Sequence, residues 1–361
     1  MTESPLFDEL NSTQREAVAA TEGPVLVVAG AGSGKTRVLT YRIAHLVRDL
    51  DVSPYSILAI TFTNKAADEM KQRVGRMVGA VVRGMWVSTF HSACVRILRR
   101  EAHRLGYRSA FSIYDDLDAR RLVEYCVRDL DLDPKRFPPK QIRAAISKAK
   151  NELVDYESFA AAGSGPYHER EAEVYRLYQQ RLVEASAMDF DDLLMVTVEL
   201  LGAFPDVLEE YQRRFRYILV DEYQDTNHAQ YRLVQMLGAA HRNVCVVGDS
   251  DQSIYAFRGA DIRNILEFER DYPDARVIVL DRNYRSTQTI LDAANAVISH
   301  NRGRTPKSLW TDLGRGDPVA VYRGQDEHDE AAFVAEELAA LEDDGVPPSG
   351  VAVFYRTHAQ S

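Results

Sequence analysis

A glycine-rich segment that ends in lysine and threonine carries the clearest chemical signal in the chain. It follows the apolar run of residues 25–28 and precedes a helical stretch that starts near residue 37. A strand, a tight turn and a helix would gather backbone N–H groups and the positive helix end around a phosphate. Lys35 could then contact the β- and γ-phosphates, and the Thr36 hydroxyl could bind Mg²⁺. The predicted phosphate-binding residues are Ala29, Gly30, Ala31, Gly32, Ser33, Gly34, Lys35 and Thr36.

The segment departs from the general phosphate-loop pattern at its first position, where Ala29 replaces the usual glycine. A glycine-rich turn that binds nothing is the alternative interpretation. The strand–turn–helix order favours a phosphate site, so we expect the chain to bind a nucleoside triphosphate.

A pair of carboxylates ends a second apolar run. Residues 218–220 are Ile-Leu-Val, and Asp221 and Glu222 follow them. A P-loop ATPase needs an acidic side chain at the tip of the strand beside the phosphate loop, because Mg²⁺ requires such a partner. Asp221 is predicted to hold the ion, and Glu222 to polarise the attacking water as a general base. A solvated acidic turn is the alternative, which the phosphate loop makes the weaker interpretation.

The loop after a third apolar run, residues 244–248, combines polar, aromatic and basic side chains. Gln252 is placed to sense a γ-phosphate. Tyr255, Phe257 and Arg258 follow in close succession. Two aromatic faces and a guanidinium on one loop are the ingredients of a single-stranded nucleic-acid track.

The elements that would position these residues form an alternating pattern. Short β-branched runs recur, mostly separated by helical stretches, which is typical of a parallel sheet with helices on both faces. The predicted strands are residues 25–29, 57–61, 86–89, 217–221, 244–248 and 277–280. Residues 107–188 break the rhythm with charged, helix-period sequence and no convincing strand. A second α/β pattern follows, with a predicted helix over 287–299 and strands over 318–322 and 350–355.

Composition restricts the class of protein. The 361 residues carry a formal charge of −10 and three cysteines without metal-site spacing. A reduced cytoplasmic compartment fits such cysteines, and the acidic N-terminus broken by Pro5 does not resemble a signal peptide. No apolar run approaches the ~20 residues of a membrane span. The acidic charge means that any nucleic acid must bind in a local groove.

Two basic runs have two interpretations of equal weight, namely phosphate contacts or solvated helix faces. The first run lies within residues 96–108 and the second within residues 135–150. Their members are Arg96, Arg99, Arg100, Arg104, Arg108, Lys135, Arg136, Lys140, Arg143, Lys148 and Lys150.

The motifs occur together in the order typical of the UvrD/PcrA/Rep family of superfamily 1 DNA helicases, which this chain closely resembles. The phosphate loop matches that of the family letter for letter, Ala29 included. Any single motif could mislead, but the complete ordered set is highly specific. The matching segments are residues 10–18, 29–36, 58–67, 87–92, 189–194, 220–227, 248–255, 283–287 and 354–357.

The resemblance implies roles for individual residues. Gln14, Arg37 and Tyr284 would surround the adenine ring. Arg285 would reach the γ-phosphate from a second RecA-like domain, as an arginine finger does. The positions that match the family's single-stranded DNA path are Phe62, His91, Phe190, Tyr255, Phe257, Arg258 and Arg356.

Three positions qualify this assignment. Phe190 could equally begin a helix that continues through residue 194. Phe257 stands where relatives commonly carry tryptophan, so its stacking area is smaller while the binding mode should survive. His358 stands where asparagine is usual.

The implied fold class is α/β, with a P-loop RecA-like parallel-sheet domain, an inserted all-helical domain and an incomplete second RecA-like domain. The predicted boundaries are 1–106 and 189–281 for the first RecA-like domain, 107–188 for the insertion and 282–361 for the second. The family's later motifs, which supply another arginine and further DNA contacts, are absent from the sequence. We therefore expect these 361 residues to bind ATP but to hydrolyse it slowly without unwinding duplex DNA.

The leading functional prediction is an ATP- and Mg²⁺-dependent motor that moves 3′ to 5′ on single-stranded DNA and separates duplex DNA at junctions. Repair or replication restart is the expected setting. The motor part of a helicase–nuclease subunit and an inactive ATP- and DNA-binding module are alternatives. A P-loop enzyme without DNA, such as a small-molecule kinase, is a fourth hypothesis. The aromatic motifs around Phe62 and Tyr255 argue against it, and stimulation of ATP hydrolysis by single-stranded DNA would distinguish it.

Overall fold

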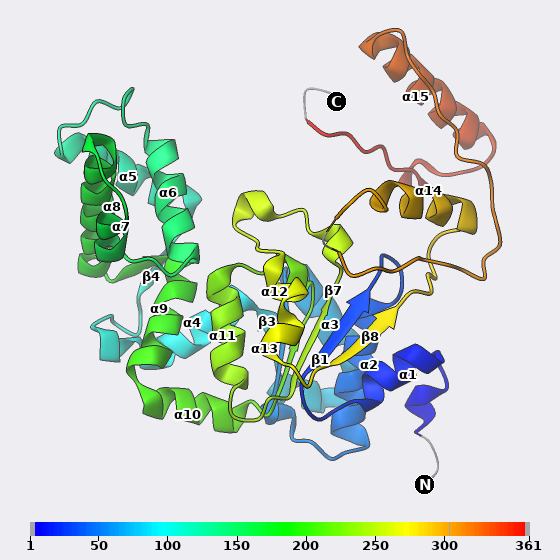
Figure 1. Cartoon of the computed structure of the whole chain (residues 1–361), viewed down its shortest axis with the longest axis horizontal. Coiled ribbons are helices and arrows are strands. Elements are labelled where there is room, and N and C mark those ends of the chain that lie inside the picture. Colours follow the sequence, from blue (N-terminus) through cyan, green and yellow to red (C-terminus); the bar gives the residue numbers. More distant parts are fainter. Residues whose placement is uncertain (1–3, 303, 358–361) are drawn as a thin grey trace.

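A six-stranded parallel sheet forms the centre of the molecule in the computed structural model, which describes residues 4–302 and 304–357 (Figure 1). The strand order is β3-β2-β6-β7-β1-β8, and every neighbouring pair is parallel. The strands are β1 (Val25–Ala29), β2 (Ile57–Thr61), β3 (Trp86–Thr89), β6 (Tyr217–Val220), β7 (Val244–Gly248) and β8 (Arg276–Leu280). All six predicted strands are confirmed, although β6 ends one residue before Asp221.

Helices cover both faces of this sheet, which explains why its strands are apolar at nearly every position. In β1, Val25 and Val27 face one hydrophobic core, while Leu26 and Val28 face the other. The first core includes residues of α1 (Ser12–Ala19), α2 (Lys35–Arg48) and α3 (Asn64–Val78). The second core includes residues of α4 (Phe90–Glu101), α9 (Phe190–Ala203), α10 (Pro205–Arg214), α11 (His228–Gly238), α12 (Arg263–Leu266) and α13 (Phe268–Asp271).

A separate helical body forms between α4 and α9, as the sequence predicts, and Figure 1 shows it beside the sheet. The third hydrophobic core of the molecule lies inside this body. Three of the four helices of the body contribute buried side chains to this core, and the fourth helix packs against them. These helices are α5 (Asp116–Asp129), α6 (Pro139–Asn151), α7 (Tyr156–Ala162) and α8 (Pro166–Glu184). The expectation of no strand here is wrong, because β4 (Ser112–Tyr114) pairs in parallel with β5 (Ala187–Asp189). Three-residue strands are too short to give a periodic signal.

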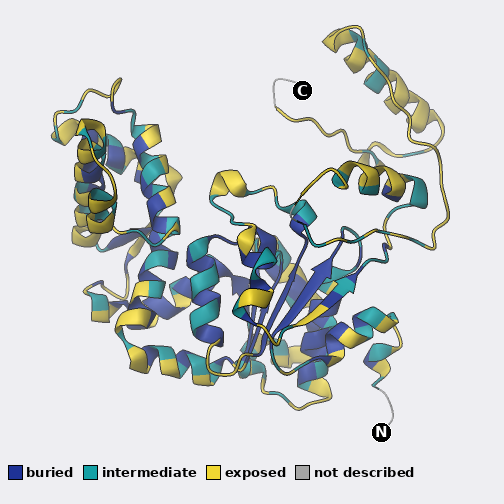
Figure 2. Cartoon of the chain, in the orientation of Figure 1, coloured by how far each residue is buried: buried dark blue, intermediate teal, exposed yellow. Residues whose placement is uncertain are grey.

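The second α/β pattern is only half confirmed. The predicted helix is present as α14 (Gln288–Ile298), and α15 (Glu327–Asp343) follows it. The strands predicted over 318–322 and 350–355 are wrong, because these segments form no ladder. Val321 and Phe354 are 92% and 93% exposed, and a strand requires neighbouring backbone groups to pair with. Figure 2 shows the contrast between the buried sheet and the largely exposed α15.

The sheet order brings the predicted chemistry to one edge. Because β6, β7 and β1 are neighbours and parallel, their carboxyl ends lie together, where ligands bind in open α/β sheets. The phosphate loop follows β1, the two carboxylates follow β6, and the loop with Gln252 follows β7. Within the described ranges, no helix is both long and apolar enough to cross a membrane.

Candidate nucleotide site and nucleic-acid interface

The glycine-rich segment forms a tight loop, the phosphate cradle, between β1 and α2. Gly32 and Gly34 have φ angles of +68° and +94°, a conformation that side chains other than glycine rarely adopt. The Ser33 hydroxyl donates a hydrogen bond to the Gly30 carbonyl at 2.7 Å. Gly34 precedes α2 without any side-chain cap, so the first N–H groups of the helix stay available to an anion.

Lys35 bridges the cradle to the acidic end of β6. Its Nζ lies 2.8 Å from Glu222 Oε2, and Gln224 Nε2 donates to the same oxygen at 2.9 Å. Burial, together with the negative charge of Glu222, raises the pKa of Asp221 to about 7 despite the opposing charge of Lys35. The site therefore holds more negative charge than one lysine neutralises, which suits a bound cation.

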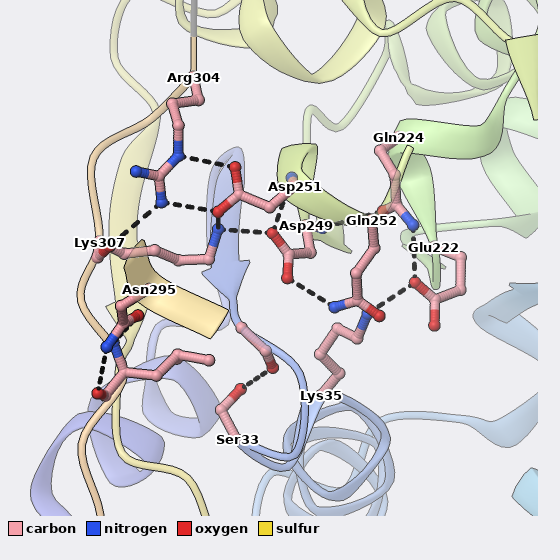
Figure 3. A network of polar contacts seen from close by, with 12 residues as sticks. Ser33, Lys35, Glu222, Gln224, Asp249, Asp251, Gln252, Asn295, Arg304 and Lys307 are labelled. Carbon is pink, nitrogen blue, oxygen red and sulfur yellow. Dashed lines mark hydrogen bonds and ion pairs between the residues drawn. The ribbon is translucent and has the colours of Figure 1, made fainter. Parts of the chain in front are cut away.

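The loop after β7 joins the same network (Figure 3). The Asp249 backbone N–H donates to Gln224 Oε1 at 2.9 Å, and Gln252 Nε2 donates to Asp249 Oδ2 at 2.5 Å. The structure thus brings the predicted residues Lys35, Glu222 and Gln252 into one hydrogen-bonded chain. Gln224 and Asp249 are its connecting members.

The residues after β8 lie directly on the phosphate loop. Asn283 Nδ2 donates to the Ala31 carbonyl at 2.6 Å, and the Tyr284 N–H donates to the Gly32 carbonyl at 2.9 Å. A Cβ atom added to Gly32 would lie 2.8 Å from Arg285 Cβ. Tyr284 and Arg285 are therefore adjacent to the phosphate cradle. Their predicted roles at the adenine ring and the γ-phosphate stay predictions.

Two of the three residues predicted to surround the adenine ring, Gln14 and Tyr284, contact the phosphate loop. Gln14 is only 2% exposed and its Nε2 donates to the Ser33 carbonyl at 3.0 Å. Asn11 Nδ2 donates to the Tyr284 hydroxyl at 2.7 Å, which joins α1 to the segment after β8. Arg37 instead pairs with Glu9 at 3.1 Å on the exposed side of α2.

Mg²⁺ is predicted to bind to Thr36 and Asp221. Thr36 lies in the first turn of α2, and Asp221 directly follows β6. In the part of the chain that the structure describes, no group of three or more His, Cys, Asp or Glu side chains could hold a metal by itself. Magnesium commonly uses one or two protein oxygens together with substrate phosphates and water. The incompletely neutralised Asp221 fits that kind of site.

Three aromatic side chains, those of Phe62, Tyr255 and Phe257, form a cluster apart from the nucleotide network. The ring centroids of Phe62 and Tyr255 are 5.0 Å apart, and those of Tyr255 and Phe257 are 5.9 Å apart. The Arg258 guanidinium lies 5.1 Å from the Tyr255 centroid. Phe257 is 79% exposed, and its loop forms one wall of a groove of about 570 Å³ whose other wall is α6, with Lys148 in its lining. Exposed rings beside basic groups suit a base-stacking surface.

A second aromatic pair contains two more predicted residues. His91 and Phe190 meet edge to face with centroids 5.9 Å apart. Burial lowers the pKa of His91, and the charge of Asp191 opposes that shift, so the imidazole is neutral near pH 7. Phe190 is 43% exposed and is also the first residue of α9. The helix start is therefore present, and the contact of Phe190 with DNA stays a prediction that its exposure allows.

Arg356 is not brought to either aromatic group. It is exposed and lies in the extended segment 351–357, which Figure 1 shows well separated from the loop after β7. His358 lies outside the described residues.

Comparison with known proteins agrees with this geometry. Residues 10–273 match the UvrD/REP helicase N-terminal domain, and residues 278–361 match the UvrD-like helicase C-terminal domain. The chain belongs to the UvrD/REP helicase family.

Several relatives are named ATP-dependent DNA helicase PcrA. The Bacillus subtilis protein is 53% identical over 357 residues, which cover 99% of this chain and 48% of the relative. The Leuconostoc citreum protein is 52% identical over 363 residues, which cover 100% and 48%. A Staphylococcus aureus relative is 51% identical over 356 residues, which cover 99% and 49%. The chain thus spans about half the length of these curated relatives.

Two members of the second basic run form ion pairs with carboxylates inside the protein. Lys150 is fully buried, with its ammonium 2.9 Å from Asp189 and 2.8 Å from Asp192. Arg143 pairs with Asp191 at 3.1 Å. These cations join α6 to the start of α9, because buried carboxylates need a charged partner. At these two positions the solvated-face interpretation is wrong.

Sequence reasoning assigned no role to several residues of the nucleotide network. Asn283, Gln224 and Asp249 lie within recognised motifs, so their neighbourhood was a usable signal. Lys307 and Arg304, which contact the loop after β7, lie in a stretch without any motif. No spacing or pattern could have found them.

Proposed function

We propose that this chain is the ATP- and single-strand-binding portion of a DNA helicase that moves 3′ to 5′ and opens duplex DNA at junctions with single strands. The observation that carries the proposal is the chain of contacts from Lys35 through Glu222 and Gln224 to Asp249 and Gln252. It joins a phosphate cradle to the loop that bears exposed aromatic rings. The curated relatives that carry the name ATP-dependent DNA helicase support it.

The ion pair between Lys35 and Glu222 suggests how binding prepares hydrolysis. Triphosphate oxygens carry more negative charge than one carboxylate, so Lys35 would move to the phosphates on binding. Glu222 would then lose its cation while keeping the hydrogen bond from Gln224. A carboxylate freed in this way can accept a proton from the attacking water.

The remaining predicted residues would surround the transferring phosphate. Thr36 and Asp221 would hold Mg²⁺, which supplies positive charge to the phosphate oxygens when bound. Gln252 would contact the γ-phosphate, and Arg285 would approach from the segment after β8. Arginine in this role stabilises the charge that develops in the transition state.

Coupling to DNA would pass through the loop after β7. Gln252 and Tyr255 are three residues apart on that loop, so a shift of Gln252 on γ-phosphate binding would also move the rings. Phe62, Tyr255, Phe257, Arg258, His91 and Phe190 would contact the strand, and Arg356 would join them only after the segment 351–357 moves. Closure of a cleft between the two proposed RecA-like domains on each ATP cycle would then pass bases along the rings.

We also propose that the chain is divided into four segments. Residues 1–106 and 189–281 form the first RecA-like domain, residues 107–188 form the inserted helical domain, and residues 282–361 begin the second RecA-like domain.

The proposed cellular setting is the reducing cytoplasm, with which the buried free cysteines Cys94, Cys126 and Cys245 are compatible. A role in repair or replication restart is part of the same proposal.

Binding experiments on this chain test the function. The chain should bind Mg-ATP, and a fluorescent oligo-dT strand should bind more tightly than a blunt duplex of equal length. Failure to bind either ATP or the single strand would contradict the proposal. Polarity is tested on a longer protein that contains this sequence, which should unwind a duplex with a 3′ tail and not one with a 5′ tail.

A further inference from the structure

A basic segment from the second half of the chain reaches into the nucleotide network (Figure 3). The Lys307 side chain is 3% exposed, and its Nζ lies 2.5 Å from Asp249 Oδ1 and also pairs with Asp251. Arg304 donates two hydrogen bonds of 2.7 Å to Asp251. Two cations from one segment therefore neutralise two carboxylates on the loop that carries Gln252.

Asp249 is the central residue of this arrangement. It is 2% exposed, and its Oδ2 accepts the hydrogen bond from Gln252 Nε2 at 2.5 Å. Its backbone N–H donates to Gln224, which binds Glu222. A buried carboxylate without a cation is strongly unfavourable, and Lys307 supplies that cation.

The segment that carries Lys307 is itself fixed on both sides. The Leu309 N–H donates to Asn295 Oδ1 of α14 at 3.0 Å, and Asn295 Nδ2 donates back to the Leu309 carbonyl at 2.9 Å. A Cβ added to Gly30 would lie 2.3 Å from Leu309 Cδ2. Leu309, two residues after Lys307, is thus held between α14 and the phosphate loop, which fixes the segment from which Lys307 extends to Asp249.

We propose that Lys307 is a positioning residue for Gln252. It neutralises Asp249, the carboxylate that accepts the hydrogen bond from Gln252, beside the site of the γ-phosphate. The inference rests on the proposed function above. Without Lys307, the carboxylate bonded to Gln252 would be unpaired and would repel the γ-phosphate. ADP has no γ-phosphate, so its binding would change little. Lys307 therefore contributes to the preference for ATP over ADP.

The test measures the affinities of this chain for AMP-PNP and ADP, each with Mg²⁺, by displacement of a fluorescent nucleotide. Lys307→Met, which keeps the length of the side chain and removes the charge, should weaken AMP-PNP binding about 5- to 30-fold, as expected for one unscreened charge at a partly buried site. ADP binding should stay within about twofold. Arg304→Gln is the matched control, because it removes the neighbouring ion pair with Asp251 and leaves Asp249 paired.

A second substitution separates positioning from a structural role. Asp249→Asn in the Lys307→Met background removes the unpaired charge and keeps an oxygen that accepts from Gln252, so it should restore the preference for AMP-PNP. Should Lys307→Met not fold, Lys307→Gln replaces it, because a glutamine side chain can still donate a hydrogen bond to Asp249. Lys307→Gln should also weaken AMP-PNP binding without changing ADP binding, but by a smaller factor.

The outcomes distinguish this inference from the proposed function. Equal losses for both nucleotides, an unchanged preference in the lysine variants, or no restoration in the double variant would overturn the role of Lys307. An unmodified chain that binds neither nucleotide would instead overturn the proposed function on which the inference rests.

Discussion

Removal of one exposed ring tests the nucleic-acid surface without disturbing the fold. Phe257 is 79% exposed, so Phe257→Ala removes little buried area and should change the free energy of unfolding by less than about 0.5 kcal/mol. One base–aromatic stack contributes about 1–3 kcal/mol. Because Phe62 and Tyr255 remain as neighbouring rings, we expect the lower part of that range, about 1–2 kcal/mol. The dissociation constant for single-stranded DNA should therefore rise about 5- to 30-fold.

The assay is a fluorescence anisotropy titration of labelled oligo-dT at fixed salt, because phosphate contacts make affinity depend on ionic strength. Tyr55→Ala is the control, since Tyr55 is 63% exposed. It precedes β2, whereas Phe62 of the aromatic cluster follows β2, so the two side chains lie at opposite ends of this strand. Phe62→Ala should weaken binding by a similar factor. Unchanged affinity in both phenylalanine variants, or an equal loss in Tyr55→Ala, would refute the assignment of these rings to the DNA path.

Two further predictions concern the acidic end of β6. Glu222→Gln should retain ATP binding, because Lys35 and the cradle remain, while any measured hydrolysis falls about 10²- to 10⁴-fold through loss of the base; loss of ATP binding would contradict the role of Glu222. Asp221 has a pKa raised from 3.8 to about 7, so the folded state holds its proton over that interval and stability falls as pH rises through it. Asp221→Asn should therefore stabilise the nucleotide- and Mg²⁺-free chain about 3 kcal/mol more at pH 8 than at pH 5 in urea unfolding, and equal effects at the two pH values would show that this carboxyl does not titrate as described.

The parallel sheet could be predicted from the sequence because both its faces are covered. Buried strands such as β1 and β7 are continuous apolar runs, and this pattern depends only on local sequence. The segments 318–322 and 350–355 have similar composition but no neighbouring strand in the described structure. Pairing is a property of two segments, so one segment alone could not show its absence.

The site was predictable where a motif carries it and not where tertiary contacts build it. Lys35 and Asp221 follow from local patterns at strand ends. The contact between Phe62 and Tyr255 joins residues far apart in the chain. The family resemblance assigned both residues to the DNA path but did not predict that their rings meet. The ion pairs of Lys150 and Lys307 have no sequence signal, because a lysine in a basic or irregular stretch has the same appearance whether it is buried or solvated.

The central claim, that the loop between β1 and α2 binds the phosphates of ATP through Lys35, is tested most directly by calorimetric titration of Mg-ATP into the chain and into Lys35→Ala. A hydrogen bond from a charged group contributes about 1.5–3 kcal/mol, so the variant should bind ATP at least about tenfold more weakly while its affinity for oligo-dT stays unchanged. Equal ATP affinities in the two proteins would contradict the claim.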